Sequence, residues 1–168
     1  MSGRINRPIL LVLVVACILS VVGMTIALRM TAPTPFEPPL FESGAQTGMP
    51  EPAEGSRYTV LNEEGLNFTV GFCASASCSV SDAGAELALY FTSPVTNLVW
   101  MKARITDGEG TLLGETGILC PGQYVEYVQL THIPADHALY VRVMTYEPET
   151  YYSNGAVTVV VTAVGEIE

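Results

Sequence analysis

The chain has 168 residues, which is enough for one domain of ordinary size with additional segments. All 17 acidic residues follow Met30, and only four basic residues do. A domain with this charge repels phosphate backbones, so nucleic acid is not an expected partner. Hydrophobic residues make up 49% of the chain, but many of them belong to one apolar block near the N-terminus.

The apolar block covers residues 9–28 and contains no charged residue. Together with Pro8, it would form a helix about 30 Å long, which matches the hydrocarbon thickness of a bilayer. Arg4 and Arg7 precede the block, which predicts that the N-terminus lies in the cytoplasm and the remainder outside. The sequence therefore predicts a cytoplasmic tip and transmembrane signal-anchor over residues 1–29. The expected location is the plasma membrane, single pass, with an extracytoplasmic C-terminal domain.

Two alternatives to an uncleaved anchor remain open at this point. One is a cleaved secretory signal, although its apolar region is typically shorter and no small-x-small site follows Leu28. The other is lipoprotein processing, because residues 14–17 resemble a bacterial lipobox and would make Cys17 the lipid-bearing residue. Since the apolar run continues past Cys17, we prefer to interpret this cysteine as a small apolar residue of the helix.

Residues 30–56 are rich in proline and show no helical or strand periodicity. The prolines are Pro33, Pro35, Pro38, Pro39, Pro50 and Pro52. This density favours an extended polyproline II stalk that spaces the domain from the anchor. Phe36, Leu40 and Phe41 are apolar exceptions. They either pack on the domain or on lipid headgroups, or they form a short motif for a partner.

Residues 57–168 contain short runs rich in valine, threonine, tyrosine and leucine, separated by turn residues. The candidate strands cover residues 67–72, 86–92, 98–106, 112–116, 124–130, 139–146 and 156–164. Within the third of them Val99, Met101, Ala103 and Ile105 alternate with Trp100, Lys102, Arg104 and Thr106, so one face is apolar and the other largely basic.

The segment from Asp107 to Gly110 predicts a hairpin turn, because glycine tolerates the positive φ that a tight turn needs. About seven short strands without an amphipathic helix between them predict an all-β fold, an antiparallel sandwich of the immunoglobulin or fibronectin III kind. It would follow one transmembrane helix and the stalk. A small β-barrel is the alternative.

The stretch 100–128, which includes Leu-Cys-Pro-Gly-Gln-Tyr-Val-Glu at 119–126, resembles small β-sandwich modules on surface proteins of Gram-positive bacteria. The later Tyr-Glu-Pro-Glu-Thr-Tyr-Tyr at 146–152 is similar as well. The resemblance covers the domain only, about two thirds of the chain. It implies adhesion, spacing or envelope assembly without a shared catalytic site, and no functional residue carries over from it.

Three cysteines lie outside the apolar block. Cys73 and Cys78 flank a loop of small residues and are the candidate disulfide, since an extracytoplasmic site permits one. A bridge from one of them to Cys120 and three free thiols are the alternatives. The odd number also allows an intermolecular bridge.

The sequence predicts neither an enzyme nor a cofactor. Cys120 with His132 or His137 could suggest a nucleophile and base, but the surroundings of Cys120 do not match a sortase, and both histidines follow the cysteine. Zinc is not expected, because the thiols lack a second close pair. Asp107 and Glu109 could hold calcium, but a hairpin turn explains them without a metal and is the preferred interpretation.

The best candidate binding surface is the segment between the last two predicted strands. Its candidate residues are Tyr146, Glu147, Glu149, Tyr151 and Tyr152. Tyrosine offers a large contact area for a small loss of conformational entropy. In the alternative interpretation Tyr151 and Tyr152 begin the last strand and pack.

The sequence thus predicts a membrane-anchored, non-enzymatic protein that binds a protein partner or takes part in envelope assembly. Binding of a carbohydrate or cell-wall ligand is the alternative, and a cysteine-dependent enzyme is disfavoured.

Overall fold

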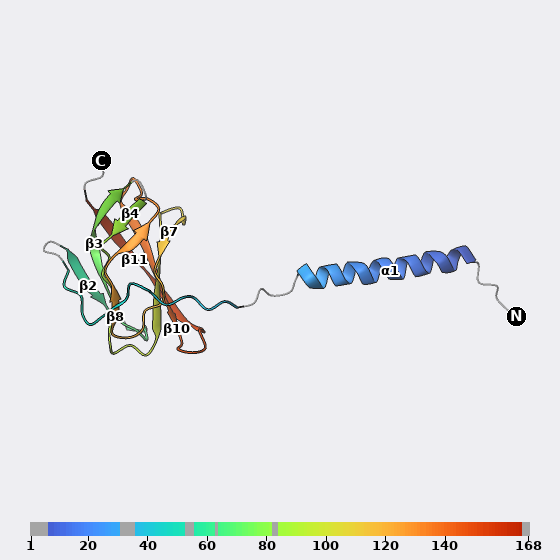
Figure 1. Ribbon diagram of the computed structural model, residues 1–168, viewed down its shortest axis with the longest axis horizontal. Helices are drawn as coiled ribbons and strands as arrows, with labels where there is room; N and C mark the ends of the chain where they lie inside the picture. Colours follow the sequence, from blue (N-terminus) through green and yellow to red (C-terminus); the bar gives the residue numbers. More distant parts are fainter. Residues whose placement is uncertain (1–6, 31–35, 53–55, 63, 82–83, 166–168) are drawn as a thin grey trace. The chain divides into compact units, whose positions relative to one another are not determined.

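The computed structural model describes residues 7–30, 36–52, 56–62, 64–81 and 84–165 (Figure 1). The chain divides into two compact units, Met1–Glu37 and Pro38–Glu168, and each is described by itself. Most of the predicted cytoplasmic tip, residues 1–6, and the stalk residues 31–35 and 53–55 lie outside the described residues.

The first unit contains the helix α1 (Arg7–Met30), which places Cys17 on an exposed face. Its side chains are described over 16 residues, 10–25. Across the described part of the chain, no helix is both long and apolar enough to cross a membrane, for which about 20 apolar residues are needed. This finding contradicts the predicted transmembrane signal-anchor. It likewise contradicts the single-pass plasma-membrane location and the extracytoplasmic, cell-surface placement that depended on the anchor.

The described residues of the second unit form eleven strands joined by hydrogen bonds. They are β1 (Gln46–Thr47), β2 (Arg57–Leu61), β3 (Val70–Ser81), β4 (Gly84–Leu87), β5 (Phe91–Ser93), β6 (Trp100–Thr106), β7 (Leu112–Glu115), β8 (Gln123–Val125), β9 (Val128–Leu130), β10 (Ala138–Tyr146) and β11 (Ser153–Val164).

These strands form one curled, mixed sheet in the order β1-β8-β5-β3-β11-β10-β6-β7, with β2, β4 and β9 attached beside it. The pairing of β3 with β11 is parallel, from Ser75 with Thr162 to Ser77 with Val164. The predicted antiparallel immunoglobulin or fibronectin III-like sandwich is therefore wrong. The cause is the long strand β3, which pairs with β2 and β5 through its first half and with β4 and β11 beyond it, and so connects the sheet around the core.

The core lies inside this curled sheet. The predicted alternation of β6 is confirmed, because Met101, Ala103 and Ile105 are completely buried and Val99, just before the strand, is 4% exposed. Apolar side chains of β10 and β11 face the same interior. Complete burial of a side chain such as Ile105 stabilises the fold by about 1.5–3 kcal/mol. The core therefore holds β6 and β10 in place, and the side chains on their solvent-facing side project from a stable sheet.

Strand β3 includes both residues of the candidate disulfide. Cys73 is buried and Cys78 is partly exposed, and both are free thiols. Five residues of extended strand separate their Cα atoms by about 16 Å, whereas a disulfide requires less than about 7 Å. A bridge between Cys73 and Cys78 is thus incompatible with this fold.

Residues 38–50, here called the N-terminal segment, run along the second unit instead of standing apart from it. The N–H of Ile118 donates to the carbonyl of Leu40, and the N–H of Glu42 donates to the carbonyl of Ile118, both at 2.9 Å. A carboxylate oxygen of Glu42 accepts the N–H of Gly117 at 2.6 Å. Strand β1 then pairs with β8. This part of the predicted stalk is integrated into the sheet.

Candidate binding surface

The loop between β10 and β11, residues 147–152, has a backbone fixed by its own hydrogen bonds. The N–H of Glu147 donates to the carbonyl of Tyr152 at 2.8 Å, and the N–H of Tyr151 donates to the carbonyl of Glu147 at 3.0 Å. Glu149 and Tyr151 have positive φ angles of 68° and 58°, which residues with side chains rarely adopt. Such strain persists only where the surroundings hold it, so the loop presents its side chains in a defined arrangement.

Three aromatic rings from distant parts of the sequence meet at this loop. Tyr151 packs against Trp100 with ring centroids 5.2 Å apart and an interplanar angle of 64°. Phe41 packs against Trp100 at 5.0 Å and 77°. Edge-to-face pairs of this kind contribute about 0.5–1.5 kcal/mol each beyond their buried area. Trp100 therefore links the N-terminal segment and the β10–β11 loop to β6.

The predicted binding residues fall into two groups. Tyr146 lies directly across from Trp100 on the neighbouring strand, and Tyr151 contacts the tryptophan ring.

The other predicted binding residues do not reach Trp100 in this way. The carboxylate of Glu147 is used within the loop, where it accepts a hydrogen bond from the hydroxyl of Thr150 at 2.9 Å. Glu149 and Tyr152 are exposed, the tyrosine by 73%. Because β11 begins at Ser153, neither Tyr151 nor Tyr152 belongs to the last strand.

We call Phe41, Trp100, Tyr146, Tyr151 and Tyr152 the aromatic cluster. Phe41 and Trp100 were absent from the predicted binding residues, although the sequence offered a signal for each. Trp100 lies on the non-apolar side of the β6 alternation, and Phe41 is an apolar exception in a proline-rich segment. Only the fold shows that these two residues adjoin the tyrosine loop.

Hydrogen bonds also fix two residues that are close to the aromatic cluster in the sequence, Asn97 before Trp100 and Asn154 after Tyr152. The side-chain amide of Asn97 is bonded on both sides to the backbone of Thr69, at 2.8 Å and 2.7 Å. The side chains of Asn67 and Asn154 are also hydrogen-bonded. Leu98, which follows Asn97, is 84% exposed. The cluster and its surroundings thus combine exposed apolar area with a rigid backbone.

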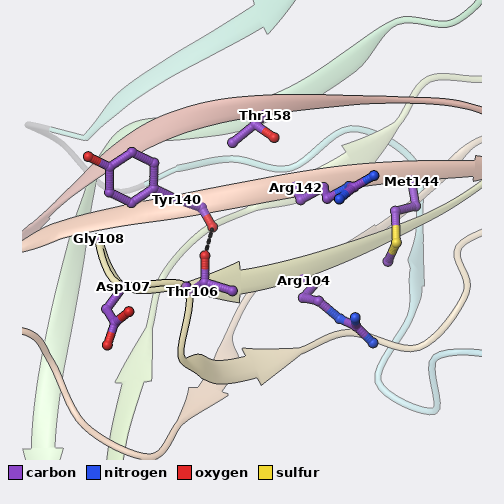
Figure 2. Close-up of a pocket in the computed structure, with 9 residues that line it drawn as sticks. Arg104, Thr106, Asp107, Gly108, Tyr140, Arg142, Met144 and Thr158 are labelled. Atoms are coloured by element: carbon purple, nitrogen blue, oxygen red, sulfur yellow. Dashed lines mark hydrogen bonds between the residues drawn. The ribbon is translucent and has the colours of Figure 1, made fainter.

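A second feature adjoins the aromatic cluster on the solvent-facing side of β6 and β10. Of the four basic residues that follow Met30, three lie here: Lys102, Arg104 and Arg142. Arg104 and Arg142 occupy directly opposite positions on paired strands and line one groove (Figure 2). We call these three residues the basic face.

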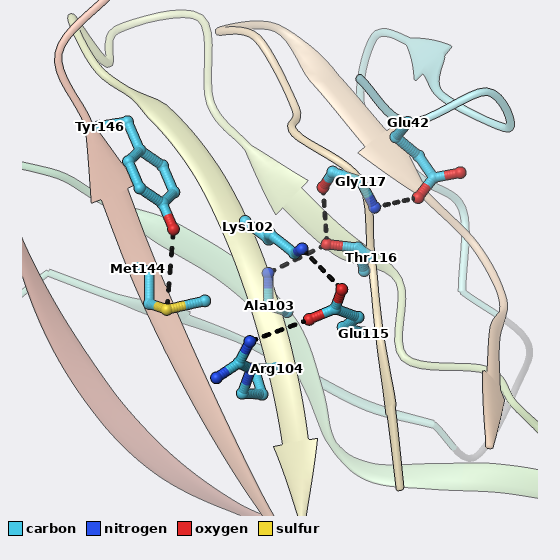
Figure 3. A network of polar contacts seen from close by, with 9 residues as sticks. All are labelled: Glu42, Lys102, Ala103, Arg104, Glu115, Thr116, Gly117, Met144 and Tyr146. Carbon is cyan, nitrogen blue, oxygen red and sulfur yellow. Dashed lines mark hydrogen bonds and ion pairs between the residues drawn. The ribbon is translucent and has the colours of Figure 1, made fainter. Parts of the chain in front are cut away.

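Glu115 on β7 neutralises one side of the basic face (Figure 3). Its carboxylate pairs with Nζ of Lys102 at 2.8 Å and with a guanidinium nitrogen of Arg104 at 3.3 Å. The hydrogen bond from Lys102 and the charges of both partners lower the pKa of Glu115. The guanidinium group of Arg142 has no hydrogen bond or ion pair with any described residue.

Substitution of Glu115 by glutamine is expected to reduce stability in a pH-dependent way. A carboxyl group with a lowered folded-state pKa stabilises the fold above its unfolded pKa of about 4.3, and this contribution disappears as the pH falls through the folded pKa. Since the side chain of Glu115 is 38% exposed, the substitution should lower the free energy of unfolding at pH 7 by only about 1 kcal/mol. Urea unfolding between pH 7 and pH 3 should show the two proteins converging at low pH. Glu109→Gln, in an exposed turn, is the control, and a constant difference across the range would contradict the ion-pair explanation.

Cys120, His137 and Asp107, which were considered from the sequence for catalysis or metal binding, are all among the described residues. Burial raises the pKa of the Cys120 thiol, which keeps it protonated and poorly nucleophilic. The ring Nδ1 of His137 lies 3.3 Å from the carbonyl of Ala163. In the described ranges, no group of three or more His, Cys, Asp or Glu side chains could hold a metal ion. The Oδ1 atom of Asp107 accepts two backbone N–H groups of its own turn, as the hairpin interpretation predicts.

Comparisons of this chain with protein-family models, with curated proteins and with solved structures find no match. The resemblance to surface modules of Gram-positive bacteria therefore stays a prediction. Function has to be argued from the chemistry and geometry of the surface itself.

Proposed function

We propose that this protein is a non-enzymatic binding protein whose β-rich unit contacts another protein through the aromatic cluster. The observation that carries the proposal is the continuous ring contact from Phe41 through Trp100 to Tyr151, beside the 73% exposed Tyr152. Tryptophan and tyrosine are enriched among residues that dominate binding energy at protein interfaces. Here they lie on a backbone that is already ordered, so binding would sacrifice little conformational entropy.

The ring geometry favours a protein over a glycan as the ligand. The rings of Phe41 and Tyr151 are turned by 77° and 64° from the plane of Trp100. They therefore do not form one flat platform on which a sugar ring could stack. Tyrosine and leucine side chains that project separately, such as Tyr152 and Leu98, instead suit the pockets of a protein surface.

A photo-crosslinking amino acid in place of Tyr152 tests this proposal. The full-length protein would be expressed in its native cells, irradiated and examined for covalent adducts with other proteins. The matched control carries the same amino acid in place of Tyr127, which is 48% exposed and lies between β8 and β9. We expect a discrete protein adduct from position 152 and none of the same mass from position 127.

A further inference from the structure

We propose that the groove between Arg104 and Arg142 binds the carboxylate group of a small organic acid with an apolar body. The groove has a volume of about 460 Å³ and an open mouth on the solvent-facing side of β6, β10 and β11 (Figure 2). This volume lies within the range of roughly 300–1,000 Å³ typical of small-molecule sites. The inference is independent of the proposed protein contact, because it uses none of the residues of the aromatic cluster.

The first argument is the charge arrangement of the two arginines. Arg104 and Arg142 are direct cross-strand partners in the β6–β10 register. Like charges at opposite positions of neighbouring strands destabilise a sheet. One guanidinium nitrogen of Arg104 reaches Glu115, but Arg142 has no ionic partner among the described residues. An anion placed between the two guanidinium groups would remove this repulsion.

The second argument is the rarity of positive charge in this domain. Of the four basic residues that follow Met30, only Arg57 lies away from the basic face. A concentration of cations on one face of an otherwise acidic domain creates a local attraction for one small anion. A larger polyanion would meet repulsion from the acidic remainder of the surface, so a small ligand is favoured.

The third argument concerns the kind of anion. The planar guanidinium forms two parallel hydrogen bonds with a carboxylate. Asp107 lies at one end of the groove, and the hydrogen bonds from its own turn lower the pKa of its carboxyl group. It is therefore an anion at neutral pH. A phosphate with two negative charges would be repelled by Asp107 more strongly than a carboxylate with one.

The remaining lining residues suit an apolar body attached to the carboxylate. Tyr140 and Met144 lie on β10 on either side of Arg142 and line the same groove. Thr158 from β11 completes the wall. Aromatic and thioether groups pack well against a hydrocarbon or aromatic ring. The groove thus provides two cations for the acid and two apolar surfaces for the rest of the molecule.

The test is a titration of the purified full-length protein with sodium benzoate, followed by the NMR signals of the arginine side chains. Benzamide has the same ring without the charge, and inorganic phosphate is a different anion. We expect benzoate to shift the signals of Arg104 and Arg142 saturably, and benzamide and phosphate to bind at least tenfold more weakly. Equal responses to benzoate and benzamide, or tighter binding of phosphate, would overturn the inference.

Two variants separate a ligand site from a structural role of Arg142. Arg142→Gln should weaken benzoate binding about tenfold or more, since a charged hydrogen-bonding partner is lost. The same change should leave the melting temperature of the ligand-free protein unchanged or raise it, because it removes a like-charge contact. Arg57→Gln, outside the groove, should bind benzoate as the wild type does. Unchanged binding by Arg142→Gln, or a lowered melting temperature in the absence of ligand, would refute the assignment.

A double substitution, Tyr151→Ser with Tyr152→Ser, distinguishes this site from the proposed protein contact. It should leave the benzoate affinity of the full-length protein within about twofold of the wild type. A loss of benzoate binding in this variant would show that the ligand occupies the aromatic cluster, and the groove assignment would then be wrong.

Discussion

Replacement of Gly117 by alanine is expected to lower the free energy of unfolding by about 3 kcal/mol and to detach the N-terminal segment from the sheet. An added Cβ atom would lie 2.5 Å from both Cα and N of Glu42 and 2.7 Å from the carbonyl carbon of Phe41. These are backbone atoms, so the whole segment has to move. Overpacking that is retained typically costs about 1–3 kcal/mol. Detachment of the segment relieves the overpacking but gives up the three hydrogen bonds that join it to Gly117 and Ile118, at about 1 kcal/mol each.

Urea unfolding and hydrogen exchange measure the two parts of this prediction. The amide of Ile118, which donates to Leu40, should lose its protection in Gly117→Ala. Gly44→Ala is the matched control within the same segment, because its added Cβ would meet nothing closer than a side-chain oxygen at 3.5 Å. Retention of wild-type stability and protection by Gly117→Ala would mean that the N-terminal segment does not lie in this place.

Substitution of Trp100 by alanine is the second change with a large expected effect. The half-buried indole contacts the rings of both Phe41 and Tyr151. Removal of a large aromatic side chain from a packed site costs about 3–5 kcal/mol when it is fully buried, and we expect about 2–3 kcal/mol here. The loop that carries Tyr151 should also become less well ordered, because the ring contact that helps to hold the positive φ of that residue is removed.

Two further variants serve as references for Trp100→Ala in the unfolding experiment. Leu98→Ala changes a side chain that is 84% exposed, and it should alter stability by less than about 0.5 kcal/mol. Trp100→Phe keeps an aromatic ring, so it should retain at least half of the unfolding free energy that Trp100→Ala loses. If alanine at position 100 were as harmless as alanine at position 98, the ring contacts would not be what orders the β10–β11 loop.

Local sequence patterns predicted the regular antiparallel part of the fold well. The alternation around β6 placed Met101 and Ile105 in the core and Lys102 on the opposite face, and all three lie as expected. The hairpin turn at Asp107 is present, with Gly110 at a φ of 87°. Periodicity and turn chemistry depend only on neighbouring residues, so a single sequence is sufficient to show them.

Features that depend on distant partners were not predictable in this way. The small residues between Cys73 and Cys78 suggested a loop, but they lie in the long strand β3 because β4 and β11 pair with it. Proline density suggested a free stalk, although Leu40 and Glu42 of that segment find hydrogen-bond partners at Ile118. None of these partners is visible from the local sequence, and the parallel pairing of β3 with β11 is what makes the sheet mixed.

The candidate site shows the same division between local and distant information. Tyr146 and Tyr151 were identified from their composition and from their place in a loop between strands. Trp100 joins them through the β6–β10 register, and Phe41 joins them through the docking of the N-terminal segment. The opposition of Arg104 and Arg142 also follows from that register alone, so the basic groove could not be predicted from either strand separately.

The crosslinking experiment at position 152 tests the central claim most directly, because it reports contact in the cell whatever the identity of the partner. We expect a discrete protein adduct at position 152 that is absent at position 127. This adduct should persist when Trp100→Phe is introduced into the same protein and should be lost with Trp100→Ala. Adducts of equal mass and yield at positions 152 and 127, or no protein adduct at position 152, would contradict binding through the aromatic cluster.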